Sequence, residues 1–492
     1  MGNALPDATG SPSDGRVRAL AFGLIAALGV VYAIFARAAL HAFPYSGDEY
    51  SYLLQAEIFA RGLLHTPAPP HLEMLRVDHV VIDGLVRSKY PPGTSALLSL
   101  GVRAGVAWLV TPIEGVITLL LAWRAARTLL PARHALVTVL LLGWSPLFLF
   151  NSSSFFAHTA TMMWLTAGFV SLAAWSVDRR SHRLVLFGAA LGCAFLTRPL
   201  DAVLFGAALL CFRSARVLAL TVLGALPFVA LNLLYQKAQF GSLFADGYHA
   251  YAATFTAVYG AHEGGSQLSP RYLVDPIETW NHLDVTRAFL LEWSVPGTAL
   301  LAAFGWASLR GDEKAKALRR YCVVCVAVFL GLFLFTMAGS DDGARARYLS
   351  TPLIPITFLA GPGWDSVRDI LRERLGRRAP LVAGIFMAVL PGVQIGSFLD
   401  RRMPKQLIRE RLPEVVASEG VTSGIVIIRA HYPTRLARNG PFFDAPVLYV
   451  SPPAETSAEE VAAAFPSRPI YEAREPTRET YDAEPWRITR VR

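Results

Sequence analysis

Two neighbouring stretches near the start of the chain set its fold class. Residues 19–40 read ALAFGLIAALGVVYAIFARAAL, and residues 44–64 read PYSGDEYSYLLQAEIFARGLL. The first stretch has 22 residues, nearly all apolar, which is long enough for a helix to cross the roughly 30 Å hydrocarbon core of a bilayer. Arg16 and Arg18 precede it, and no small-residue cleavage site follows, so we expect a retained membrane helix rather than a cleaved signal peptide.

The second stretch predicts a different kind of helix. Apolar residues recur at positions 53, 54, 58, 59 and 63, a spacing typical of an amphipathic helix on the outer membrane surface. Asp48 and Glu49 stand near its start. The helix dipole favours acids there, so capping is one explanation for the pair and chemistry is the other.

The composition extends this interpretation to the whole chain. Of 492 residues, 53% are hydrophobic and only 17% are charged, with a formal net charge of +9. Soluble globular proteins carry about 25% charged residues. The composition therefore excludes an ordinary soluble enzyme, a disordered chain and a fibrous one, and it predicts an all-α polytopic membrane protein.

With the first helix, further apolar runs bring the expected number of spans to eleven. The others are 111–130, 135–150, 157–177, 184–197, 199–212, 217–236, 288–309, 321–338, 349–364 and 380–398. If the tail 1–18 is cytoplasmic, the inside segments hold 20 Lys or Arg in 69 residues and the outside segments hold 11 in 144. This asymmetry predicts an inner (plasma) membrane protein with its N-terminus inside and its C-terminus outside.

The apolar run 94–110 is not counted, because a span there would reverse every later loop; we expect a helix lying at the outer interface. A transmembrane domain over 19–398 then has outer loops at 41–111 and 237–288. The more polar tail 399–492 is expected to be a small extracytoplasmic α/β module. Its strands are predicted at 424–430, 445–451 and 468–473, and its helix at 457–465.

Four other stretches of the sequence contain candidate site residues. Lys89 and Tyr90 precede the rigid turn Pro91-Pro92-Gly93. Lys89 is either a snorkelling lysine or a point charge for a phosphate at headgroup height.

Arg345, Arg347 and Tyr348, in GSDDGARARYLSTPLIP (339–355), crowd the outer end of a helix, as headgroup anchors or as part of a site. Arg198, in FLTRPLDAVLF, either pairs with Asp201 or serves a ligand. His158 begins a helix and is either structural or a site residue.

The cysteines carry no comparable signal. All four lie in apolar runs, and the Cys322-x-x-Cys325 spacing falls inside YCVVCVAVFLGLFLF, which lacks partners for zinc. We interpret them as packing residues and expect no disulfide framework.

The order of these motifs resembles the GT-C superfamily of membrane glycosyltransferases, and most of all its protein-mannosyltransferase and aminoarabinose-transferase (family 39-like) branch. The motifs are SGDEYSYLLQAEIFARGLL, SKYPPGTSALLSL, FLTRPLDAVLF and RARYLSTPLIP. The resemblance covers roughly residues 17–400 and leaves out the tail.

The resemblance implies a donor sugar carried on a polyprenyl phosphate and an acceptor outside the cytoplasm, with no nucleic acid involved. It implies a hexosyl- or pentosyltransferase of the cell envelope. The family's outer-loop acid matches Asp48, with Glu49 beside it, and its lysine before the Pro-Pro turn matches Lys89. The late arginine and tyrosine match Arg347 and Tyr348. A divalent metal ion at Asp48 or Glu49 stays open, because some branches use one and others do not.

Charge then suggests a mechanism. Breaking a sugar–phosphate bond leaves negative charge on the phosphate, which cations stabilise, while a carboxylate takes the acceptor proton. Asp48 is the candidate base. The candidate ligands of the lipid phosphate are Lys89, Arg198, Arg345, Arg347 and Tyr348, with Tyr90 and His158 as weaker candidates for substrate binding. One-step transfer with inversion is the simplest form. A transporter or flippase of lipid-linked saccharides and a non-catalytic scaffold are the alternatives.

Overall fold

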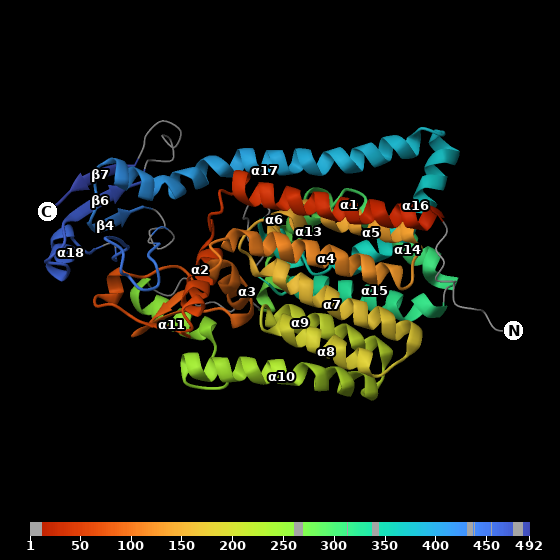
Figure 1. Ribbon diagram of the computed structural model, residues 1–492, viewed down its shortest axis with the longest axis horizontal. Coiled ribbons are helices and arrows are strands. Elements are labelled where there is room, and N and C mark those ends of the chain that lie inside the picture. Colours follow the sequence, from red (N-terminus) through yellow and green to blue (C-terminus); the bar gives the residue numbers. More distant parts are fainter. Residues whose placement is uncertain are drawn as a thin grey trace.

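The computed structural model is mainly a bundle of helices with a small module at one end (Figure 1). It describes residues 12–259, 269–311, 313–336, 344–430, 436, 438–453, 455–475 and 486–492. The bundle contains α1 (Pro12–Ile34), α4 (Val110–Arg127), α5 (Ala132–Gly143), α6 (Pro146–Asn151), α7 (Ala157–Asp178), α8 (His182–Phe195), α9 (Pro199–Ala207), α10 (Ala215–Phe240), α13 (Pro276–Ala288), α14 (Thr298–Ser308), α15 (Glu313–Phe333) and α16 (Leu353–Leu375).

Within the described ranges, five helices are long and apolar enough to cross a membrane. They are Asp14–Ala39, Ala107–Arg127, Ala157–Asp178, Ala215–Phe240 and Ala379–Asp400. A bent pair, Pro276–Trp293 with Thr298–Ser308, makes a sixth if it is one span, and three shorter apolar helices accompany them. The chain is thus a helical protein with several apolar helices, and the count of eleven spans stays a prediction.

Two predicted spans are broken by proline. The expected helix at 288–309 is wrong as a single rod, because Pro276–Trp293 and Thr298–Ser308 meet at 85°. Pro296 and Gly297, which has a φ of +86°, lie in the break. The expected helix at 135–150 divides into α5 and α6, and Pro146 opens α6, since proline lacks the amide hydrogen that a helix interior needs.

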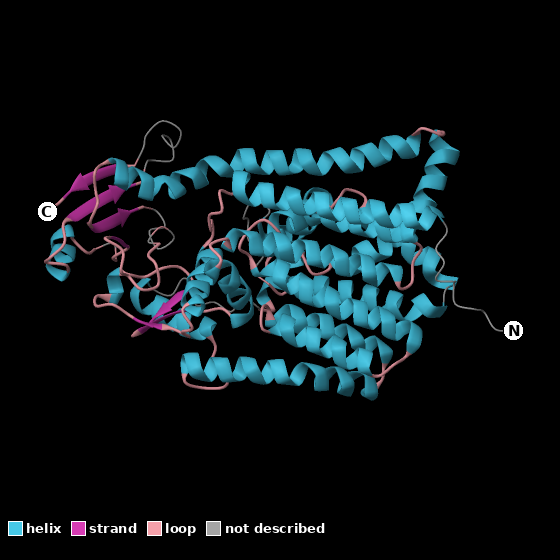
Figure 2. Cartoon of the chain, in the orientation of Figure 1, coloured by secondary structure: helices cyan, strands magenta, loops and turns pink. Residues whose placement is uncertain are grey.

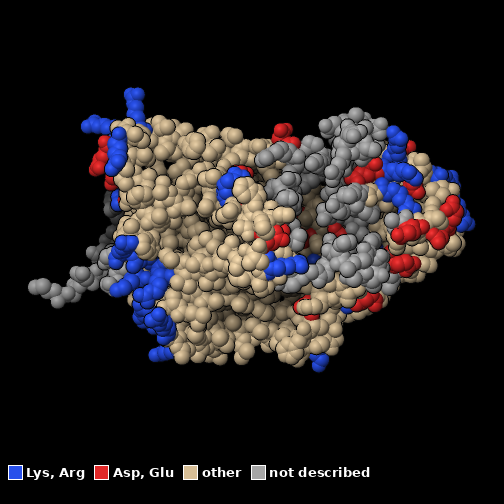
Figure 3. All heavy atoms as spheres, turned by 180° about the vertical axis from the view of Figure 1, so that it is seen from behind, with Lys and Arg blue, Asp and Glu red and all other residues tan. Residues whose placement is uncertain are grey.

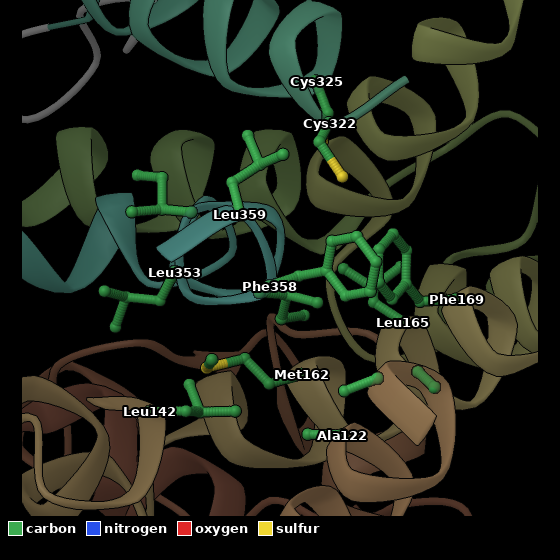
Figure 4. Packing of buried hydrophobic residues seen from close by; sticks show 14 of the residues in the cluster. Ala122, Leu142, Met162, Leu165, Phe169, Cys322, Cys325, Leu353, Phe358 and Leu359 are labelled. Carbon is green, nitrogen blue, oxygen red and sulfur yellow. The ribbon is translucent and has the colours of Figure 1, made fainter. Parts of the chain in front are cut away.

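The bundle core is apolar and closely packed. Cys322 and Cys325 are both fully buried free thiols within it, as expected of packing residues, and they lie near Phe358 and Phe169 (Figure 4). Helices α14 and α16 cross so closely that a Cβ added to Gly305 would lie 1.8 Å from the Leu359 carbonyl oxygen.

A second layer lies at one end of the bundle, between the helices and the C-terminal module (Figure 1). It contains α2 (Gly47–Ala60), α3 (Pro92–Arg103), α11 (Gly247–Tyr259) and an antiparallel sheet of β1 (Thr66–Pro67), β3 (Leu85–Ser88) and β2 (Val80–Ile82), in that order. The short helix α12 (Arg271–Val274) precedes α13. The turn between β2 and β3 is Asp83-Gly84, with Gly84 at a φ of +103°, a common hairpin sequence. The sequence analysis predicted α2 but no strand in this loop.

The module is a four-stranded sheet with one helix (Figure 2). Its order is β5-β4-β6-β7, where β4 is Gly424–Arg429, β5 Val447–Val450, β6 Ile470–Arg474 and β7 Arg487–Arg490, and α18 is Ala458–Ala464. Strand β4 runs parallel to β5 and β6, and β7 runs antiparallel to β6. The strand at 487–490 was not predicted.

Helix α17 (Ala379–Ser418) joins the bundle to the module as one helix of 40 residues. The predicted span at 380–398 therefore does not end where its apolar composition ends. The polar stretch RERLPEVVAS continues the helix, because a change from apolar to polar residues marks the edge of a membrane and not the end of a helix.

Charge is concentrated at the two ends of the molecule. In Figure 3 a wide band of uncharged surface separates basic side chains near the N-terminal end from mixed charges around the module. This is the distribution expected of a protein whose middle lies in a bilayer.

Candidate active site

Helix α2 begins with a complete capping box, in which one of the two acids, Glu49, takes part. Ser46 is the N-cap, and its Oγ accepts a hydrogen bond from the Glu49 amide at 3.1 Å. Glu49 Oε2 accepts from the Ser46 amide at 3.0 Å, and Oε1 accepts from the Phe155 amide at 3.0 Å. Glu49 is 1% exposed. Its carboxylate is therefore engaged in fixing the helix start to the loop before α7.

Asp48 is not the cap; its side chain lies among donors from three other parts of the chain. The Tyr90 hydroxyl donates a hydrogen bond to Oδ1. Arg347 Nη2 lies 3.3 Å from Oδ2, and His79 Nε2 lies 3.6 Å from Oδ1. Arg347 belongs to η8 (Ala344–Leu349), a short helix before α16. The Asp48 side chain is 21% exposed, so it is still accessible from outside.

These neighbours determine the charge of Asp48. Burial alone would raise the pKa of its carboxyl, but His79, Arg347 and Lys89 and the hydrogen bond from Tyr90 together hold this pKa below the ordinary aspartate value. Burial raises the pKa of Glu49 against the opposing hydrogen bonds from Ser46 and Phe155. The two adjacent acids thus have opposite electrostatic environments, a pattern often found in active sites.

Lys89 lies in a box of tyrosine rings next to Asp48. Its Nζ is 5.2 Å from the ring centres of Tyr90 and Tyr248 and 4.6 Å from that of Tyr251. The last two rings come from α11, which approaches so closely that a Cβ on Gly247 would lie 2.2 Å from the Lys89 carbonyl oxygen. The lysine is 7% exposed. A desolvated ammonium group held by ring faces is well suited to bind an anion.

A second group of site candidates surrounds Tyr348. The guanidinium of Arg347 lies 5.2 Å from the Tyr348 ring centre and that of Arg198 lies 5.8 Å from it. Arg198 Nε pairs with Asp201 Oδ2 at 2.8 Å, which is the structural alternative that the sequence left open. The His158 ring lies 6.4 Å from Tyr348 and is buried, and neither of its nitrogens has a hydrogen-bond partner among the residues that the structure describes.

The predicted site residues whose side chains the structure describes therefore lie close together. Asp48, Lys89, Tyr90 and Arg347 lie together, and Arg198, Tyr348 and His158 lie beside Arg347. The side chain of Arg345 lies outside the described residues.

Three residues of the site were missed from sequence. His79 precedes β2 and has a φ of +64°, and Tyr248 and Tyr251 lie on α11. For the two tyrosines the signal was the richness of the 237–288 loop in Tyr, His and Gly; His79 lies outside that loop and carried no such signal.

The donor set does not suit a divalent metal. The Asp48 oxygens face Tyr90, Arg347 and His79, and the Glu49 oxygens accept backbone amides. Among the residues that the structure describes, no group of three or more His, Cys, Asp or Glu side chains could hold a metal ion.

Comparisons with known proteins identify what this architecture resembles. The family model described as dolichyl-phosphate-mannose-protein mannosyltransferase matches residues 93–235. No curated protein sequence matches the chain.

Among solved structures, ArnT from Cupriavidus metallidurans bound to undecaprenyl phosphate is similar over 93% of both chains, with 13% identity and a TM-score of 0.54. Its apo state is similar over 96% of this chain and 94% of that chain, with 16% identity and a TM-score of 0.54. The chain has the fold of ArnT, and the predicted resemblance to GT-C glycosyltransferases of the family 39-like branch is confirmed.

Proposed function

We propose that the protein is an integral-membrane glycosyltransferase that moves a sugar from a polyprenyl-phosphate donor to an extracytoplasmic acceptor. The main support is the environment of Asp48. Its accessible carboxylate contacts Arg347, His79 and the Tyr90 hydroxyl, which come from separate segments of the chain. The ArnT likeness supports the proposal, because ArnT was solved with undecaprenyl phosphate.

In this proposal the lipid phosphate binds between Lys89 and Arg347. The bond between the sugar carbon and the phosphate oxygen breaks, and the two cations stabilise the charge left on polyprenyl phosphate. The acceptor hydroxyl attacks the opposite face of the same carbon, with inversion, and gives its proton to Asp48.

The same cations explain how Asp48 is released for catalysis. Arg347 now pairs with Asp48 at 3.3 Å, and a carboxylate with a lowered pKa is a weak base. A phosphate bound at Lys89 and Arg347 competes for these charges and brings the Asp48 pKa back towards its ordinary value. Donor binding thereby makes the base stronger at the point where it is needed.

The position of the site favours transfer over transport. Asp48, Lys89 and Arg347 all lie outside the candidate membrane spans, whereas a transporter places its charged residues near the middle of the membrane. The proposed orientation places the site on the outer side of an inner (plasma) membrane, and it rests on the basic-residue count. The sugar is a hexose or a pentose.

Mass spectrometry of lipid and glycan fractions tests the proposal. Cells without the gene are compared with cells that express wild-type protein or Asp48→Asn at equal abundance. We expect a sugar-modified acceptor only with the wild type, and accumulation of a polyprenyl-phosphate sugar in the other two. Equal product from wild type and Asp48→Asn would overturn the proposal.

A further inference from the structure

The C-terminal module reaches into the active-site layer through the loop between β4 and β5. The Arg438 guanidinium donates hydrogen bonds to the carbonyl oxygens of Pro44 and Tyr45, the second at 3.2 Å. It lies over the rings of Phe43, at 4.4 Å, and Tyr50, at 5.8 Å. These bonds hold the two residues that immediately precede the N-cap of α2.

A cation is unfavourable at the start of a helix, where the helix dipole is positive. Arg438 is retained there with specific compensation from two carbonyl oxygens and two ring faces. The charge of Glu49 adds an electrostatic attraction. The contact of Arg438 with the start of α2 is therefore specific, because several groups stabilise the guanidinium there.

Neighbouring residues of the same loop extend the contact along α2. The Tyr50 hydroxyl donates to the Asn439 carbonyl, and the Asn439 side chain is fixed to Tyr449 of β5 by hydrogen bonds of 2.7 and 2.8 Å. At the other end of α2, the Arg61 guanidinium lies 3.5 Å from the ring centre of Phe442. The loop thus connects the full length of α2 to the module sheet.

A second set of contacts connects the module, through residues 74–76, to helix α11 on the Lys89 side of the site. The Ser451 amide donates to Met74 O at 2.9 Å, and its Oγ donates to Arg76 O at 2.7 Å. The Arg76 guanidinium in turn donates to the carbonyl of Thr254 on α11. Helix α11 carries the two tyrosines that face Lys89.

We propose that the C-terminal module sets the geometry of the active site, with Arg438 as the positioning residue for Asp48 and Arg76 as the positioning residue for the tyrosines around Lys89. The module is then an essential part of the transferase and not a separate binding head. The expected effect of the module on catalysis rests on the proposed function, whereas its contacts with α2 and α11 are independent of that function.

The test uses full-length protein in proteoliposomes with undecaprenyl phosphate as the binding probe. Arg438→Met removes the hydrogen bonds at similar side-chain length, and Arg490→Met is the matched control because Arg490 is an exposed residue of β7. Since small misplacements of catalytic groups slow reactions steeply, we expect Arg438→Met to lower kcat about 10-fold or more. Probe binding should stay within about twofold of the control. Arg438→Lys should recover part of the rate.

Arg76→Met should instead weaken probe binding more than it lowers kcat. Hydrogen exchange of residues 44–52 should rise in Arg438→Met and not in Arg490→Met. If Arg438→Met folds poorly, Tyr50→Phe, which loses only the hydroxyl contact to Asn439, gives the same comparison in a milder form.

Exchange and kcat equal to the control in Arg438→Met and Tyr50→Phe would overturn the inference. A wild-type protein that neither binds the probe nor transfers sugar would overturn the proposed function instead, and the exchange measurement would still decide the role of Arg438.

Discussion

At the scale of single residues, two adjacent acids have separate tasks. Glu49 accepts two backbone amides and is 1% exposed, while Asp48 faces Tyr90, His79 and Arg347 and is accessible. The sequence identified the pair of acids but could not show which of them takes part in the helix cap and which faces the cationic side chains. The division depends on Phe155, which lies far away in the chain, and on a capping box whose geometry only the folded helix start shows.

Asp48→Asn should therefore mainly lower the rate, and Glu49→Gln should mainly lower the stability. Asparagine keeps the shape of Asp48 but cannot accept a proton at neutral pH, so the rate should fall about 10²-fold or more with little change in stability. Glu49→Gln should lower the free energy of unfolding by about 1–3 kcal/mol, because glutamine has one acceptor oxygen for the two amides of Ser46 and Phe155, with a smaller loss of rate. Steady-state kinetics and denaturant unfolding of both variants measure this; a fully active Asp48→Asn contradicts it.

The pH dependence should respond to Arg347. This cation helps to hold the Asp48 pKa down, so Arg347→Gln should raise the pKa. The acid limb of kcat/KM, below which Asp48 is protonated, should then move to higher pH. Arg103→Gln is the control, because Arg103 binds the carbonyl oxygens of Ala60 and Phe59 at the far end of α2. An acid limb at the same pH in both variants would show that Arg347 does not act on Asp48.

At the scale of elements, the helical spacing of apolar residues and the break at Pro199 predicted the helices correctly. The helical spacing in residues 44–64 predicted α2, and the Thr197-Arg198-Pro199 break separates α8 from α9. The hairpin of β2 and β3 was missed because its strands have only three and four residues. His79 was missed with it, since its position beside Asp48 comes from the pairing of those strands and not from its own neighbours in sequence.

Helix α11 should be sensitive to a single methyl group. The Cβ of Gly247→Ala would meet the Lys89 carbonyl oxygen at 2.2 Å, so α11 must move away and carry its tyrosines with it. We expect Gly247→Ala to weaken binding of undecaprenyl phosphate about 10-fold, on the scale of a 1.4 kcal/mol loss.

Gly384→Ala is the matched control, because nothing lies within 4 Å of a Cβ there and alanine is the better helix former. Native mass spectrometry with the lipid compares the two. Equal affinities would mean that α11 does not form part of the lipid site.

At the scale of the whole molecule, composition predicted a helical membrane protein but not how many times it crosses. Apolar runs that look equivalent in sequence become long helices, short ones such as α5, or the bent pair around Pro296. Hydropathy measures how apolar a run is, whereas the number of crossings depends on where prolines break it and how its pieces pack.

The predicted orientation rests on the distribution of basic residues and can be tested by fusion. The predicted inside segments are richer in Lys and Arg than the outside ones. Alkaline phosphatase fused after residue 400 should be active, and the same enzyme fused near residue 315 should be inactive. The reverse pattern would place Asp48 in the cytoplasm and exclude the proposed acceptor side.

From the length and position of α17 we expect turnover to respond to the thickness of the membrane. The helix has 40 residues, about 60 Å at 1.5 Å per residue, and it runs along the edge of the bundle to the module (Figure 1). Only 6% of its most apolar window is buried in the protein, so we expect lipid tails to cover this part of the helix. Helices answer hydrophobic mismatch by tilting, and a tilt of α17 would move the module that follows it, whose loop between β4 and β5 carries Arg438. We expect turnover in reconstituted vesicles to pass through a maximum as the lipid acyl chains are lengthened, and Arg438→Met to flatten that maximum.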